Sequence, residues 1–252
     1  MLLRIGSALL AGAVLAQAFE PLGWALLLPL GVAGFVLVVR GLPAGRAWLP
    51  GLAFGIGFQF TLLFWMRVVG YEAWAALAAL EAAFFAPLGA ATAVLLRRRA
   101  GAAWVAAAWV AVETIRSDWP FSGMPWGRLS FAVAGTWWQD ALAYVGMAGV
   151  SFLLALLGTL LAQVVAGPRR REGALAGAVV GVVAVLPTLA PWTVPTAGER
   201  TVAVVQGDVP GDGSDVLLDH RQVTRNHVEA TVELADEVAA GTRPQPDFVV
   251  WP

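Results

Sequence analysis

The segment 144-YVGMAGVSFLLALLGTLLAQVVA-166 contains no charged residue along its whole length. A helix needs about 20 apolar residues to cross the hydrocarbon core of a bilayer, so this segment is long enough to span one. The segment Trp74–Leu96 is also long and apolar, with Glu81 as its single charged residue. The composition agrees, because 59% of the 252 residues are hydrophobic and 13% are charged, whereas soluble domains are about half apolar and about a quarter charged. The sequence therefore predicts a membrane protein.

Further apolar segments bring the predicted number of membrane spans to about seven. They are Leu2–Phe19, Leu22–Val39, Ala47–Met66, Gly101–Ile115 and Gly173–Ala190. An alternative for the first segment is a cleaved signal peptide, because Arg4 precedes the apolar run and 16-AQA-18 resembles a cleavage site. The next apolar segment follows almost at once, which favours two spans joined by a turn at 19-FEPLG-23.

The arginines predict the orientation of these spans, because cytoplasmic loops are enriched in basic residues. With a cytoplasmic N-terminus, most of the arginines of the membrane part fall inside: Arg4, Arg40, Arg46, Arg97, Arg98, Arg99, Arg169, Arg170 and Arg171. Only Arg67, Arg116 and Arg128 fall in outer loops. Seven spans then place the residues after about 191 outside the cytoplasm. The expected location is therefore a cell membrane that the chain crosses several times. The net charge of −1 gives no sign of a nucleic-acid partner.

Residues 193–252 are predicted to start a second domain, after a membrane domain of residues 1–192. The apolar run Val202–Val205 and the run Phe248–Trp251 are typical of strands buried on both faces. Between them, apolar residues recur at helical spacing from Leu217 to Val238, with Ser214 or Asp215 as a possible cap and Gly241 as the stop. This is a strand–helix–strand unit, which predicts parallel strands. One such unit is too small for a complete sheet, so we expect the chain to be a fragment.

The chain offers little for metal binding. It has no Cys, which excludes thiolate sites. His220 and His227 lie about 10 Å apart along the predicted helix, too far for one metal, and are interpreted as solvated.

Several polar residues fall inside the predicted spans. Glu81 lies near the middle of the fourth, where a carboxylate is functional, bonded to a neighbouring helix or protonated. Glu113 and Arg116 are three residues apart and are predicted to pair on one helix face. Gln59 and Gln163 are expected to tie helices together.

The outer loop 116-RSDWPFSGMPWGRLSF-131 combines helix-breaking prolines and glycines with aromatic residues. Its Trp119, Phe121, Trp126 and Phe131 are typical of a membrane interface. One interpretation is an aromatic belt. The sharper one is a loop folded beside the place where a lipid enters, with Gly123, Pro125 and Trp126 facing the lipid or substrate.

Six segments of the chain form an ordered set of motifs. They are 19-FEPLGW-24, 57-GFQFTLLFWM-66, 122-SGMPWG-127, 149-GVSFLLAL-156, 202-VAVVQGDVP-210 and 247-DFVVWP-252. Together they resemble the apolipoprotein N-acyltransferase family of bacterial lipoprotein maturation, which implies a bacterial plasma membrane. In the third, Met124 replaces the phenylalanine of the family's Gly-Phe-Pro-Trp loop. The resemblance implies a polytopic α-helical membrane domain followed by the first βαβ unit of an incomplete nitrilase-like α/β sandwich.

The resemblance also implies a reaction, in which a fatty acyl chain passes from a phospholipid to the N-terminal amine of a diacylglyceryl-cysteine lipoprotein. The family's triad is Glu-Lys-Cys, and its general base is expected immediately after Pro252. The chain contains neither Lys nor Cys, so none of the triad is present and we expect these residues to be inactive alone. No cofactor is implied, because a thioester route uses side chains only.

Two other classes of protein stay open. A transporter or channel would favour charges at mid-membrane, for which Glu81 is the one candidate. A non-catalytic truncated scaffold would share the membrane domain without the chemistry.

Overall fold

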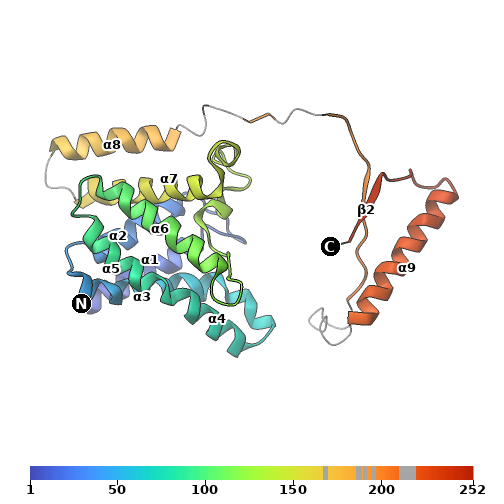
Figure 1. The fold of residues 1–252 in the computed structure, drawn as a ribbon, viewed down its shortest axis with the longest axis horizontal. Helices are drawn as coiled ribbons and strands as arrows, with labels where there is room; N and C mark the ends of the chain where they lie inside the picture. The colour runs from blue at the N-terminus through green and yellow to red at the C-terminus, as the bar shows by residue number, and fades with distance from the viewer. Residues whose placement is uncertain (167–169, 186–188, 190–191, 194–196, 210–219, 252) are drawn as a thin grey trace. The chain divides into compact units, whose positions relative to one another are not determined.

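The computed structural model of the protein describes residues 1–166, 170–185, 189, 192–193, 197–209 and 220–251. The chain divides into two compact units, Met1–Trp192 and Thr193–Pro252 (Figure 1). The first is helical, and the second holds a small parallel sheet with one helix.

The first unit contains helices that follow the predicted apolar segments closely. The described elements are α1 (Leu2–Ala16), α2 (Leu27–Val39), α3 (Ala44–Leu62), the 3-10 helix η1 (Phe64–Val68), α4 (Tyr71–Ala83), α5 (Phe85–Leu95), α6 (Gly101–Asp118), the 3-10 helix η2 (Leu129–Val133), α7 (Ala141–Ala166) and α8 (Arg170–Val185). Gly146 interrupts α7 with a φ of 65° and a ψ of −179°. The turn between α1 and α2 is longer than predicted, so α2 begins at Leu27 instead of Leu22.

Within the described residues, two helical stretches are long and apolar enough to cross a membrane. These are Tyr71–Leu95, which comprises α4 and α5, and Ala141–Ala166. They are the two segments that the length rule favoured, so this part of the prediction is confirmed. Helices α1 and α2 are apolar but shorter, at 15 and 13 residues. The remaining predicted spans stay a prediction.

Helix α1 is packed tightly into the first unit. A Cβ on Gly12 would lie 2.1 Å from the carbonyl oxygen of Phe54, and one on Gly57 would lie 2.0 Å from that of Leu9. Small residues let two helix backbones approach in this way, as is typical of membrane helices. The packing supports a retained first helix over a removable signal peptide.

The core of the first unit is aromatic where α2, α3, α5 and α6 meet. Phe54 lies at its centre, with ring centroids 4.9 Å from Phe35, 5.6 Å from Phe85 and 6.1 Å from Trp109. Most of these pairs are edge-on or tilted, the arrangement that aromatic quadrupoles prefer. This rigid centre fixes the ends of the same helices, where the polar features lie.

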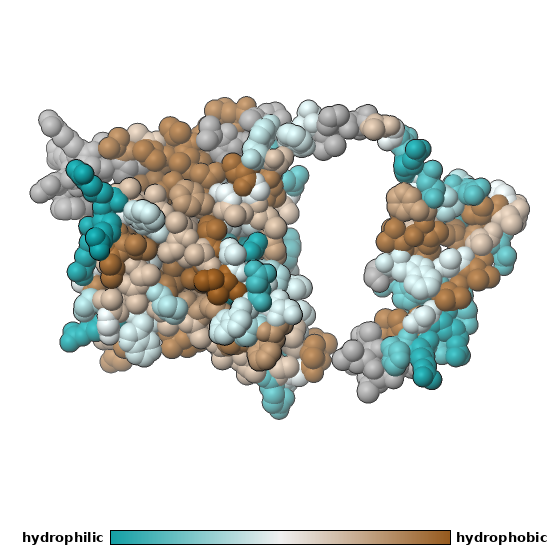
Figure 2. Space-filling view, in the orientation of Figure 1, coloured by the Kyte–Doolittle hydropathy of each residue, from teal (hydrophilic) through white to brown (hydrophobic). Residues whose placement is uncertain are grey.

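Several arginines predicted to be cytoplasmic gather at one end of the helical unit. Arg4 Nη1 donates to the carbonyls of Val38 (3.0 Å) and Arg40 (2.8 Å). Arg40 Nη1 donates to Ala166 O at 2.6 Å. Figure 2 shows hydrophilic side chains at the ends of this unit and brown, hydrophobic side chains between them. We call this the arginine end; which side of a membrane it faces stays a prediction.

The second unit has the predicted strand–helix–strand order. Strand β1 (Val202–Val204) pairs in parallel with β2 (Phe248–Val250), with Ala203 opposite Val249, and α9 (His220–Ala239) connects them. Gly241 ends the helix region with a φ of 70°, as predicted. The predicted caps Ser214 and Asp215 lie outside the described residues.

The prediction that both strands are buried on both faces is wrong for this structure. Val204 is 71% exposed and Phe248 is 51% exposed. The cause is coverage: α9 is the one helix described in this unit, so it can cover only one face of the strand pair. Apolar runs of this kind are typical of strands whose two faces are covered in a larger parallel sheet. Two strands and one helix are too small to give that cover.

Candidate functional site

A cavity of about 680 Å³ lies at the end of the helical unit opposite the arginine end. Helix α1 starts near the end of α2 at the arginine end, so the turn that joins these two helices lies at the other end. That turn forms one side of the cavity. The remaining walls come from the end of α3, from η1, and from the loop and 3-10 segment after α6. The lining residues are Ala18, Phe19, Glu20, Pro21, Leu22, Gly23, Leu62, Trp65, Trp126, Gly127, Phe131, Ala132, Ala134, Gly135 and Thr136.

The turn between α1 and α2 is ordered by its own backbone. Gly23 N donates to Phe19 O at 3.0 Å, and Trp24 N donates to Gln17 O at 3.1 Å. Gly23 has a φ of 63°, a conformation that glycine adopts easily. The ring of Phe19 packs on Phe58 of α3 at 5.7 Å, which fixes the turn to the bundle.

The loop after α6 is folded back onto the end of that helix. Gly123 has a φ of 73°, and a Cβ there would lie 2.1 Å from the carbonyl carbon and oxygen of Ser117. Only glycine fits such an approach. Met124 N then donates to Arg116 O at 2.8 Å. The loop is therefore folded compactly against the end of α6.

Of the three residues predicted to face a lipid or substrate, Trp126 lies in the cavity wall. Its ring centroid is 5.7 Å from that of Trp65, and each side chain is 47% exposed. Gly123 and Pro125 do not line the cavity; they shape the loop behind Trp126. Phe131, also named for this loop, lines the cavity as well. Trp119 packs on Phe84 instead, and Phe121 is exposed. Whether any of them contacts a lipid stays a prediction.

A buried ion pair lies beneath this loop. Arg116 of α6 pairs with Glu81 of α4, and both side chains are buried in the bundle. Arg116 Nη2 also donates to the carbonyl oxygen of Trp126 at 2.5 Å. Arg116 was expected in an outer loop, and this is wrong, because α6 continues through it to Asp118.

The predicted Glu113–Arg116 pair is also wrong. Glu113 Oε1 instead accepts from Trp109 Nε1 (3.0 Å) and from the backbone N–H of Leu129 (2.9 Å). The i,i+3 spacing permits a pair, but Glu81 on the neighbouring helix takes the guanidinium. Of the alternatives for Glu81, bonding to a neighbouring helix is confirmed.

Gln59 does not tie helices together as predicted. It is fully buried, and neither its Oε1 nor its Nε2 has a hydrogen-bond partner within the described part of the chain. Gln163 is half-buried in α7, and its role stays a prediction. Close glycine contacts and aromatic packing hold the helices together here.

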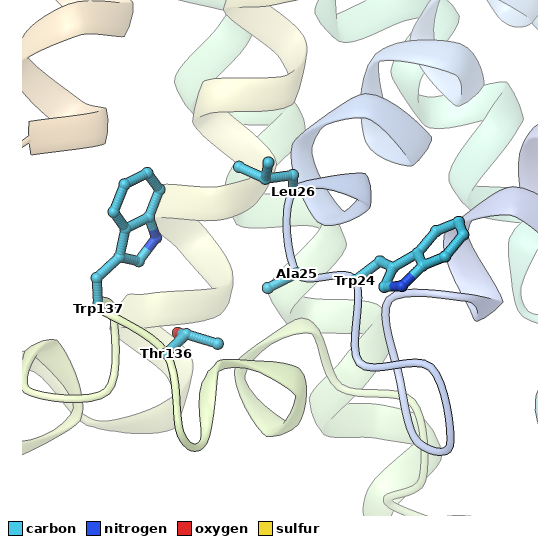
Figure 3. Close-up of a pocket in the computed structure, with 5 residues that line it drawn as sticks. All are labelled: Trp24, Ala25, Leu26, Thr136 and Trp137. Carbon is cyan, nitrogen blue, oxygen red and sulfur yellow. The ribbon is translucent and has the colours of Figure 1, made fainter.

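Apolar grooves continue from the cavity. One of about 480 Å³ is lined by Trp24, Ala25, Leu26, Thr136 and Trp137, and in Figure 3 Leu26 extends toward Trp137. A smaller hollow of about 180 Å³ shares four of these residues and reaches Leu154 and Leu157 of α7. Thr136 also lines the cavity, so the grooves lie beside it.

In the second unit, the prediction of a solvated His227 is wrong. Its side chain is buried, Nδ1 lies 2.8 Å from Val223 O, and its ring centroid is 5.4 Å from that of Trp251. The loop after β1 causes this burial, because Gly207 packs directly on the backbone and ring of His227. His220 is exposed, as predicted. Within the described residues, no group of three or more His, Asp or Glu side chains could hold a metal ion.

Sequence reasoning missed Trp65, Glu20 and Thr136 as cavity residues. The signal was present for Trp65, since it lies in 57-GFQFTLLFWM-66 at the end of an apolar segment. Glu20 belongs to the quoted turn, but nothing in its spacing points to the loop that lies more than a hundred residues later.

The fold and the cavity together define a class: a helical membrane protein with an aromatic-lined cavity at one end of its bundle and an appended α/β unit. A family model described as "Apolipoprotein N-acyltransferase N-terminal domain" matches residues 11–160. The chain belongs to the apolipoprotein N-acyltransferase family, as its motifs predicted.

Curated relatives agree with this assignment. The chain is 37% identical over 271 aligned positions to an apolipoprotein N-acyltransferase of Mycolicibacterium smegmatis, covering 98% of this chain and 46% of that protein. It is 35% identical to the enzyme of Methylococcus capsulatus, covering 81% of this chain and 44% of that protein. It is 37% identical to that of Ralstonia nicotianae, covering 81% and 42%. The chain spans less than half the length of these relatives.

Proposed function

We propose that this chain is the membrane-embedded, substrate-receiving part of an enzyme that transfers a fatty acyl chain to lipoproteins. Family membership supports the reaction class, since each relative is named apolipoprotein N-acyltransferase. The observation that carries the proposal is the cavity, because three of the family-like segments contribute to its walls although they are far apart in the chain.

The chemistry itself would need residues beyond those present here. Acyl transfer through a thioester requires a nucleophilic thiolate, a base and donors for the oxyanion. The 252 residues contain no Cys and no Lys. By resemblance, the general base would follow Pro252, at the carboxyl end of β2 where parallel sheets carry their chemistry. The role of this chain is to hold the substrates and to aim that residue, without a cofactor.

The proposed topology has about seven spans, a cytoplasmic N-terminus and an extracytoplasmic, nitrilase-like second unit. The gathering of Arg4 and Arg40 at one end of the bundle supports it, because positive charge marks the cytoplasmic side. The cavity, at the opposite end, would then open at the outer face of the plasma membrane.

The proposed partners are a phospholipid as acyl donor and a diacylglyceryl lipoprotein as acceptor. The mixed cavity suits a polar headgroup and an ester, and the apolar grooves that share Thr136 suit the acyl chain. Glu81 no longer supports a transporter, since Arg116 balances its charge.

A photoactivatable phospholipid tests this proposal. Residues 1–252 are placed in lipid nanodiscs with a phospholipid that carries a diazirine near its ester. Mass spectrometry should locate the label on peptides that contain Trp65, Trp126 or Trp137. Trp126→Ala should lower that labelling, whereas Trp119→Ala, an exposed tryptophan of the same loop outside the cavity, should not. Labelling spread evenly over the lipid-facing helices would contradict the lipid site. Acyl transfer to a diacylated lipopeptide in the same nanodiscs would contradict the proposed division of roles.

A further inference from the structure

The loop that carries Trp126 is held from below by two charged side chains. Arg116 Nη2 donates to the carbonyl of Trp126 at 2.5 Å. Glu113 Oε1 accepts from the N–H of Leu129 at 2.9 Å. Both side chains are buried, and neither lines the cavity. The two side chains therefore hydrogen-bond the loop backbone on either side of Gly127 from outside the cavity.

The backbone at Gly127 lies very close to the side chains beneath it. Its φ is +80°, and an added Cβ would lie 2.6 Å from Leu62 and 3.3 Å from Arg116 Nη2. The backbone thus turns directly over the guanidinium. This turn directs the indole of Trp126 toward Trp65.

Charge balance explains how Arg116 can be buried here. A buried charge is costly unless an opposite charge and hydrogen bonds compensate it. Glu81 supplies the opposite charge from α4. A buried ion pair is weak evidence for stability, because apolar residues of similar size often serve as well. A role in placing the loop accounts for the position of this pair better than stability does.

We propose that Arg116, balanced by Glu81, is a positioning residue that fixes the Trp126 backbone and so sets the wall of the cavity. The identity of what enters the cavity rests on the proposed function. The positioning of the loop by Arg116 does not rest on the proposed function, because it depends on contacts within this chain alone.

Fluorine NMR of 5-fluorotryptophan in the 252-residue chain tests this positioning directly. The chain has 12 tryptophans, and Trp126→Phe and Trp65→Phe assign the two resonances. Arg116→Lys keeps a charge for Glu81 but loses the planar fork that reaches two acceptors at once. It should shift and broaden the Trp126 and Trp65 resonances and leave that of Trp104, which lies outside the cavity, in place.

Two further variants separate positioning from general stabilisation. The double variant Glu81→Gln with Arg116→Met removes both members of the ion pair, so neither is left buried without the other, and it should disturb the same two resonances. Glu113→Gln is the matched control, because its amide oxygen can still accept from Leu129 N and Trp109 Nε1; both resonances should stay in place. A merely structural role would instead lower the unfolding temperature and move resonances throughout the bundle.

Lipid labelling completes the test. With the photoactivatable phospholipid, Arg116→Lys should lose several-fold of the label on the cavity peptides, whereas Glu113→Gln should keep it. Unchanged Trp126 and Trp65 resonances in folded Arg116→Lys would overturn the proposal. If Arg116→Lys shifts the Trp126 and Trp65 resonances but the unmodified chain shows no lipid label at the cavity, the positioning role is supported and the lipid site is refuted.

Discussion

The two ends of the helical unit use arginine in opposite ways. At the arginine end, Arg4 and Arg40 lie near the surface and donate to carbonyls at the ends of helices. At the cavity end, Arg116 is fully buried and donates to a loop carbonyl while an acid on another helix balances it. Arg4 and Arg40 satisfy carbonyls at helix ends while they stay partly in contact with solvent. Arg116 is buried and holds a loop that forms the cavity wall. The position of an arginine within its helix, more than its presence, decides which task it has.

The largest expected effect concerns which end faces the cytoplasm. The chain has no native Cys, so a thiol reagent can label only the cysteine that a single substitution introduces. Arg98→Cys, near the arginine end, should be shielded from a membrane-impermeant thiol reagent in intact cells. Arg225→Cys, on the exposed face of α9, should be labelled almost completely. The opposite pattern would reverse the proposed topology.

Removing Arg116 should destabilise the bundle strongly. Arg116→Ala leaves Glu81 buried without its partner, and breaking a buried pair in this way costs about 3–5 kcal/mol. The free energy of unfolding in detergent, from denaturant titration, measures the loss. Adding Glu81→Gln to Arg116→Ala should recover part of the loss, because it removes the unbalanced charge. No recovery would mean that packing of the Arg116 stem, and not charge balance, carries the stability.

Two glycines with similar φ angles sharpen the comparison between the ends. Gly123 has a φ of 73° and would clash with Ser117, whereas Gly41, near the arginine end, has a φ of 75° and open space around it. Gly41→Ala should cost about 1–2 kcal/mol for the left-handed backbone alone. Gly123→Ala should cost more, and it should also displace the loop. The unfolding temperature measures the loss of stability, and the Trp126 fluorine resonance measures the displacement of the loop. Equal losses of stability for the two variants would show that the loop can move away from Ser117 without cost.

The difference between the ends also marks what the sequence could predict. The membrane-length helices, the parallel strand pair, the Gly241 stop and the family all follow from local patterns or ordered motifs. The gathering of Arg4 and Arg40 at one end of the bundle follows from the alternation of the predicted spans. The Glu81–Arg116 pair does not, since 35 residues separate its members and a nearer acid, Glu113, has suitable spacing.

The cavity was predictable only in part, for a related reason. The sequence identified Trp126 and the turn at 19–23 as separate motifs, but their meeting depends on how α1, α3 and α6 cross. The burial of His227 was missed because it depends on Gly207, which lies well before α9 in the chain. Contacts of this kind are set by tertiary packing and leave no periodic trace.

The smallest expected effect is at Arg4. Arg4→Gln shortens the side chain and removes two hydrogen bonds, to Val38 O and Arg40 O, at the end of α2. Water can replace them at this partly exposed site, so the free energy of unfolding should fall by about 1 kcal/mol or less. The loss should shrink further in high salt, because a cation near a helix C-terminus acts partly through charge. A loss comparable to that of Arg116→Ala would mean that the arginine end is as finely fitted as the cavity end, and the contrast between them would fail.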